Sequence, residues 1–176
     1  MRRRGGAPAA AGPGPAAGPD RFKMKEKIAS IGDDFWIETM AGRKAYYVDG
    51  KALRLRETVV LKEARGGELF QIQSKIVAIK DKMSIEKDGR EVAVVKKALV
   101  TPLRDRMTVN VTGGPDIEVK GNILAHEYTM ERGGRRICEV SKRWVSIRDI
   151  YTVEAAAGED PAFLLAVTVV IERMTD

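Results

Sequence analysis

The sequence predicts a mostly β domain that encloses one apolar helix near its C terminus. Glycine-containing turn signals recur between runs of β-branched and aromatic residues, which is typical of antiparallel hairpins. A second observation is that the ten residues from Ala162 to Ile171 are apolar except at Thr168. A helix that is apolar on every side must be enclosed by protein. The simplest enclosure is a closed β-sheet around the helix.

Alternating residues predict individual strands from the start of the domain. In residues 22–28 the side chains of Phe22, Met24 and Ile28 alternate with lysines, which favours a strand over a short amphipathic helix. Residues 107–111 and 116–120 alternate apolar and polar side chains with a period of two. Such strands bury one face and expose the other. These segments therefore predict half-exposed antiparallel strands.

Five turn signals predict about ten strands. They are Asp49-Gly50, Gly66-Gly67, Asp88-Gly89, Gly113-Gly114 and Gly133-Gly134. At the second, third and fifth of these turns, the incoming strand runs from apolar to charged residues and the outgoing strand ends in basic residues. This pattern predicts a hairpin that is used three times.

The apolar C-terminal segment begins with a helix-start signal. Asp160 can accept hydrogen bonds from the free N–H groups of the first turn, and Pro161 suits the first helical position. Ten helical residues span about 15 Å, half of the roughly 30 Å hydrocarbon core, so we predict a buried helix and no transmembrane span. The β-branched residues at 167 and 169–171 leave a strand as the alternative.

Length and charge predict one domain, residues 22–176, behind a tail, residues 1–21. The chain of 176 residues carries a net charge of +6, and the tail contains four arginines against one aspartate. Residues 22–176 carry 27 Lys and Arg against 24 Asp and Glu, which does not favour a nucleic-acid partner. Prolines at 8, 13, 15 and 19 interrupt any signal-peptide core, so a disordered tail is predicted. The alternative is that Arg2–Arg4 tether the chain to an anionic surface.

Catalytic, metal and cofactor motifs are missing from the sequence. Cys138 is the single cysteine and His126 the single histidine, and neither has the spacing of a triad or a zinc site. A packed thiol and a structural or surface imidazole are predicted, and Trp36 and Trp144 are expected to fill the core. We therefore expect a protein that is not an enzyme and has no cofactor, in the reducing cytoplasm.

Several short motifs, in order along the chain, resemble bacterial members of the LURP-one-related family over about residues 22–175. They lie at residues 46–51, 101–106, 113–116, 121–124, 126–128, 140–144 and 158–160. The resemblance implies a Tubby C-terminal-like fold, also suggested for phospholipid scramblases: a closed antiparallel barrel of about twelve strands threaded by a hydrophobic C-terminal helix. A scramblase role is not favoured, because the cysteine-rich palmitoylation segment has no counterpart here.

Basic residues at strand ends are the remaining candidates for function. Lys96, Lys97, Arg104 and Arg106 lie close along the chain on both sides of a Pro102 turn, and we nominate them for binding an anionic headgroup such as a phosphoinositide. The alternative is solvated charge that protects strand edges. The predicted function is a non-catalytic binding domain for anionic lipid or a membrane surface, peripheral to the membrane. A scaffold domain with an unknown protein partner, and a small-ligand or enzymatic role, remain as alternatives.

Overall fold

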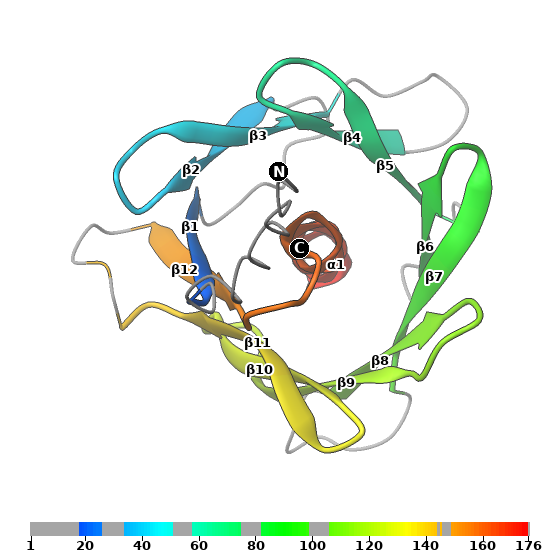
Figure 1. The fold of residues 1–176 in the computed structure, drawn as a ribbon. Coiled ribbons are helices and arrows are strands. Elements are labelled where there is room, and N and C mark those ends of the chain that lie inside the picture. The colour runs from blue at the N-terminus through cyan, green and yellow to red at the C-terminus, as the bar shows by residue number, and fades with distance from the viewer. Residues whose placement is uncertain are drawn as a thin grey trace, which may run out of the picture.

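Twelve antiparallel strands form a closed barrel around one helix (Figure 1). A computed structural model describes residues 18–25, 34–50, 58–74, 82–98, 106–143, 145 and 149–175. The elements are β1 (Asp20–Lys25), β2 (Phe35–Thr39), β3 (Lys44–Asp49), β4 (Thr58–Glu63), β5 (Glu68–Ser74), β6 (Lys82–Lys87), β7 (Arg90–Lys97), β8 (Arg106–Val111), β9 (Ile117–Asn122), β10 (Glu127–Arg132), β11 (Arg135–Ser141), β12 (Ile150–Ala155) and α1 (Pro161–Thr175). This architecture confirms the predicted fold class.

Each strand pairs with its neighbours in sequence, and β1 closes the barrel by pairing with β12. The closing ladder places Asp20 opposite Ala155 and Lys25 opposite Ile150. The strand predicted at residues 22–28 is therefore confirmed for its described part, but it begins two residues earlier. Asp20 and Arg21 belong to the barrel and not to the tail, and Arg21 forms an ion pair with Glu154. Residues 1–17 of the predicted tail lie outside the described residues.

All five predicted turn signals lie between paired strands, and four of them are tight turns as expected. Gly66-Gly67, Asp88-Gly89, Gly113-Gly114 and Gly133-Gly134 each separate two paired strands. Asp49-Gly50 leads from β3 to its partner β4, but it is not a tight turn, because β3 ends at Asp49 and β4 begins only at Thr58. The N–H of Gly50 instead donates a hydrogen bond to Asp34 Oδ1 over 3.1 Å.

The predicted repeated hairpin is present, and its three copies share one irregularity. β4, β6 and β10 each have six residues, and in each the register shifts between the fourth and fifth residue. An extra residue on the partner strand at this point is a β-bulge, which increases the local twist. A β-bulge at the same position therefore increases the twist of all three hairpins, which helps the sheet to close into a barrel.

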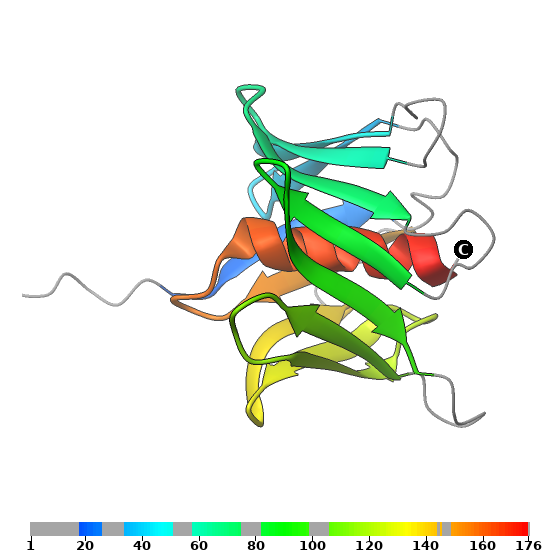
Figure 2. The same cartoon turned by 90° about the vertical axis from the view of Figure 1, so that its right-hand side faces the viewer.

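The helix begins as the sequence predicts and extends further than predicted. Asp160 Oδ1 accepts a hydrogen bond from the N–H of Phe163 at 3.2 Å, and Pro161 is the first helical residue. α1 continues past Ile171 to Thr175 and so includes the buried Glu172. The helix lies along the barrel axis (Figure 2). No helix in the described part of the chain is long and apolar enough to span a bilayer.

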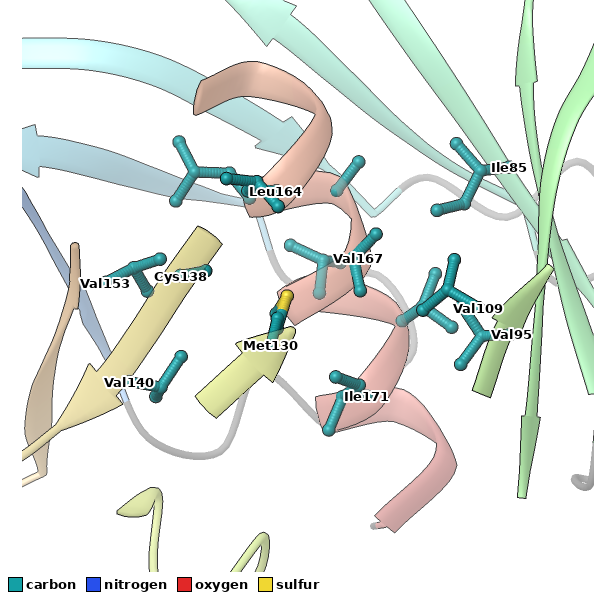
Figure 3. Close-up of a cluster of buried hydrophobic side chains, with 14 of the residues drawn as sticks. Ile85, Val95, Val109, Met130, Cys138, Val140, Val153, Leu164, Val167 and Ile171 are labelled. Atoms are coloured by element: carbon teal, nitrogen blue, oxygen red, sulfur yellow. The ribbon is translucent and has the colours of Figure 1, made fainter. Parts of the chain in front are cut away.

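The core lies between the inner face of the barrel and all sides of α1 (Figure 3). Val167 and Ile171 of the helix are fully buried, and strand residues such as Ile85, Val109 and Met130 pack in the same cluster. Burying each side chain of this size stabilises the folded state by roughly 1.5–3 kcal/mol. The apolar helix is therefore the centre of the core, and only residues near its two ends, Pro161, Phe163, Arg173 and Thr175, are partly exposed.

Trp36 is not part of this core, so the prediction that its side chain fills the core was wrong. Its ring lies 4.8 Å from the ring of Tyr47, its cross-strand partner, and Lys44 Nζ lies 4.4 Å from the ring centroid. Residues on either side of Trp36 in the ladder, Phe35 and Ile37, are those that face the core. Trp36 therefore lies on the outer face of the barrel. Trp144 lies outside the described residues.

Candidate anion-binding surface

The four basic residues nominated from the sequence do not all lie together. Lys96 is paired with Thr108, and Lys97 is paired with Met107, whose side chain is buried in the core. Because neighbouring strand residues face opposite sides of the sheet, Lys96 lies on the outer face and Lys97 on the inner side at the rim. Arg106 shares the outer face, one step diagonally from Lys96. Arg104 lies outside the described residues.

The structure adds Lys82, which the sequence analysis did not nominate. Lys82 lies directly opposite Lys96 in the β6–β7 ladder, and both side chains are exposed. Like charges in this position repel and destabilise a sheet. No acidic side chain in the described part of the chain lies within ion-pair distance of either lysine. Two exposed lysines thus lie opposite each other, and neither has an acidic ion-pair partner among the described residues.

A shallow depression of about 560 Å³ lies on the outer face beside these two lysines. Its lining includes Lys82, Lys96, Asn110 and Thr112, with Val94 as an apolar part. Glu91 also contributes to the lining. Lys82, Lys96 and Thr112 can donate hydrogen bonds to an oxyanion in this depression. The Asn110 amide already donates to Asp116 Oδ2 at 2.8 Å, and the Glu91 carboxylate would repel an anion on its side of the depression.

Arg106 lies at the edge of this surface, where nearby acidic residues partly neutralise the positive charge. Its cross-strand neighbour Lys120 contacts Glu118 at 2.7 Å and Glu131 at 2.9 Å. The hydrogen bond from Lys120 is the main cause that lowers the pKa of Glu118, and the charge of Arg106 is a smaller cause. Arg106 is therefore a weaker contributor than the Lys82–Lys96 pair.

Further basic residues lie on the rim at the C-terminal end of α1, the right-hand end of the barrel in Figure 2. The basic residues described there include Lys25, Lys82, Lys96, Lys97, Arg106, Lys142 and Arg143. Arg143 is partly neutralised by an ion pair with Glu139. Acidic residues at this rim are mostly engaged within the protein: Asp49 pairs with Lys62 at 2.8 Å, and Glu127 accepts hydrogen bonds from Ser141 and from the N–H of Lys142. This end of the barrel is consequently the one suited to an anionic partner.

His126 occupies a structural position at the same end of the barrel. Its Nδ1 lies 2.8 Å from Oε1 of Glu172, and its ring stacks on Tyr151 with 4.5 Å between centroids. The contact holds the last turns of α1 against β12 and the turn before β10. This packing fits the structural role expected from the sequence. No group of three His, Cys, Asp or Glu side chains among the described residues is arranged to hold a metal.

Cys138 is buried in the core, as expected for a packed thiol. Burial raises the pKa of the thiol far above its ordinary value, so the reactive thiolate is suppressed. We expect a disulfide reagent such as Ellman's to leave the folded protein unmodified at pH 8 and to modify one thiol per chain after denaturation. Rapid reaction of the native protein would contradict the buried position.

Residues 20–172 match the sequence profile of the family described as LURP-one-related. The chain belongs to this family. The chain is similar to the uncharacterized protein YxjI of Bacillus subtilis (strain 168). The two are 26% identical over 151 residues, which cover 86% of this chain and 91% of YxjI. The resemblance inferred from the short motifs is thereby confirmed.

The fold of this LURP-one-related chain is similar to an X-ray structure of a protein from Arabidopsis thaliana. The TM-score is 0.67 with 16% sequence identity, and the match covers 92% of this chain and 95% of the plant protein. At that identity the likeness concerns the fold alone. Function must therefore be argued from the surface of this chain.

Proposed function

We propose that this LURP-one-related barrel is a non-catalytic binding domain for anionic phospholipid headgroups at a membrane surface. The observation that carries the proposal is the exposed Lys82–Lys96 pair on the outer face of β6 and β7. A phosphate between the two ammonium groups would replace their repulsion with two charge-assisted hydrogen bonds. Arg106 and the basic rim would add attraction toward a surface that carries many such phosphates.

Two features favour a membrane surface over an isolated small anion. The depression beside Lys82 and Lys96 is open and lies on the barrel exterior, so it does not enclose a ligand as a small-molecule site would. The basic residues also extend along one rim instead of converging on one atom. Charge spread over a rim suits a surface of many headgroups.

The double substitution Lys82→Gln/Lys96→Gln tests this proposal. Each lysine near an anionic membrane contributes about 1 kcal/mol, so losing two should weaken binding to phosphatidylserine-containing vesicles roughly thirty-fold. Affinity is measured by vesicle co-sedimentation of the full chain at low salt, with thermal unfolding as a check of the fold. Both lysines are exposed, so stability should be unchanged or slightly raised.

The same two strands supply a matched control at the other end of the barrel. Lys87 lies opposite Arg90 beside the β6–β7 turn, so Lys87→Gln/Arg90→Gln removes the same charge from the same hairpin. We expect this variant to bind vesicles within about three-fold of the wild type, since its charges face away from the membrane. Equal losses in the two variants would mean that net charge alone matters and would reject the assigned surface.

A further inference from the structure

One apolar side chain stands apart on the basic rim. Leu124 lies in the turn between β9 and β10, and 67% of its surface is exposed, while its neighbour Ile123 is buried. The other described large hydrophobic residue that is exposed, Met40, lies in the β2–β3 hairpin at the opposite end of the barrel. Four other described turns, those between β4 and β5, β6 and β7, β8 and β9, and β10 and β11, carry glycine at their tips. Leu124 is therefore an unusual residue for a turn that faces only water.

Two hydrogen bonds close the turn that carries Leu124. Asn122 Oδ1 accepts a hydrogen bond from the N–H of Ala125 at 3.1 Å, and the N–H of His126 donates to the carbonyl of Ile123 at 3.0 Å. His126 has a φ of +54°, a left-handed conformation that is costly for a residue with a side chain. Its contacts with Glu172 and Tyr151 maintain that conformation.

The hydrogen bonds of this turn keep the Leu124 side chain away from the core. A flexible turn would allow a leucine to fold back onto the apolar interior, as Ile123 does. The strained backbone at His126 and the Asn122 hydrogen bond oppose that movement.

Leu124 also lies close to the basic groups of the proposed surface. Arg106 is paired with Lys120 in the β8–β9 ladder, and Leu124 follows four residues later at the rim. β7, which carries Lys96, is the next strand beyond β8, and strands are about 4.8 Å apart. A bilayer that contacts Lys96 and Arg106 through its headgroups is therefore within reach of Leu124.

We propose that Leu124 is a membrane-insertion residue: it enters the boundary between headgroups and acyl chains while the basic rim contacts anionic headgroups. This inference rests on the proposed function and adds the orientation, with the C-terminal end of α1 toward the membrane. Combining an apolar residue with cationic residues is how peripheral proteins bind an interface. Positive charge supplies attraction, and Leu124 supplies the apolar contact.

A fluorescent probe at position 124 tests insertion directly. Because Cys138 is buried, an environment-sensitive thiol probe on Leu124→Cys can be attached to the native full chain at one site. Adding phosphatidylserine-containing vesicles should shift its emission to the blue, while vesicles of phosphatidylcholine alone should not. The matched control is Met40→Cys, 41% exposed at the other end of the barrel, whose probe should remain water-like.

Affinity provides the second measurement. Leu124→Gln should weaken binding to the anionic vesicles roughly ten-fold, with the salt dependence and the unfolding temperature unchanged because neither charge nor core is altered. If the wild type binds but the probe at 124 stays water-like and Leu124→Gln binds equally well, insertion is wrong and the basic surface stands. If the wild type binds no anionic vesicle, both proposals are overturned.

Discussion

Replacing Thr168 with lysine is expected to abolish folding of the soluble barrel. The Thr168 side chain is fully buried in α1, and its hydroxyl donates a hydrogen bond to the Leu164 carbonyl at 2.9 Å. The polar group beside it, the Tyr128 hydroxyl, is itself completely buried, and that burial raises the tyrosine pKa. An unpaired ammonium at this position costs several kcal/mol, against a total stability of about 5–15 kcal/mol.

Thr175→Lys provides the matched control for this prediction. It makes the same substitution in the same helix, at the last helical residue, which is half-buried. A lysine near a helix C terminus interacts favourably with the helix dipole, so the free energy of unfolding should change by less than about 1 kcal/mol. Urea unfolding of the two variants measures the difference. Near-normal stability of Thr168→Lys would show that this side of α1 is accessible to water.

Replacing Gly121 with alanine is the second substitution with a large expected effect. Gly121 has a φ of +137° in β9, and an added Cβ would lie 2.5 Å from the Glu127 carbonyl oxygen and 2.7 Å from Tyr128 Cα. Both contacts are with the backbone of β10, so no side chain can move to relieve them. We expect the free energy of unfolding to fall by about 3 kcal/mol or more.

Gly42→Ala separates the steric clash from the backbone conformation. Gly42 has a φ of +79°, and a Cβ there would meet no atom within 4 Å. This control should cost only about 1 kcal/mol, the typical penalty for a side chain in a left-handed conformation. Chemical denaturation of both variants gives the comparison. Equal small losses would mean that β9 and β10 separate locally at little cost.

The closed barrel was predictable from sequence because its signals are local. Alternation, four of the five turn signals and the Asp160-Pro161 helix start each depend on residues that are adjacent in the chain. The end of α1 was placed too early because Glu172 and Arg173 are polar. Glu172 is tolerated inside the barrel through its contact with His126, which is far away in the sequence. Local patterns do not report such pairings.

The candidate site was only half predictable for a similar reason. The alternation rule already separates Lys96 from Lys97, so their opposite faces could have been inferred from sequence. The position of Lys82 opposite Lys96 could not be inferred in this way. Regular pairing that starts from Lys87 opposite Arg90 would place Lys82 opposite Val95. The bulge between Ile85 and Glu86 shifts the register by one residue and brings Lys82 opposite Lys96. Nothing in the sequence of this strand marks the bulge.

Binding of the full chain to vesicles as salt is raised tests the central claim most directly. Co-sedimentation with phosphatidylserine-containing and phosphatidylcholine vesicles is compared at about 0.1 M and about 1 M salt, where the Debye length falls from about 10 to 3 Å. We expect binding to the anionic vesicles only, and its loss at high salt. No binding to anionic vesicles, or binding that high salt leaves unchanged, would contradict an anionic membrane surface as the partner of this barrel.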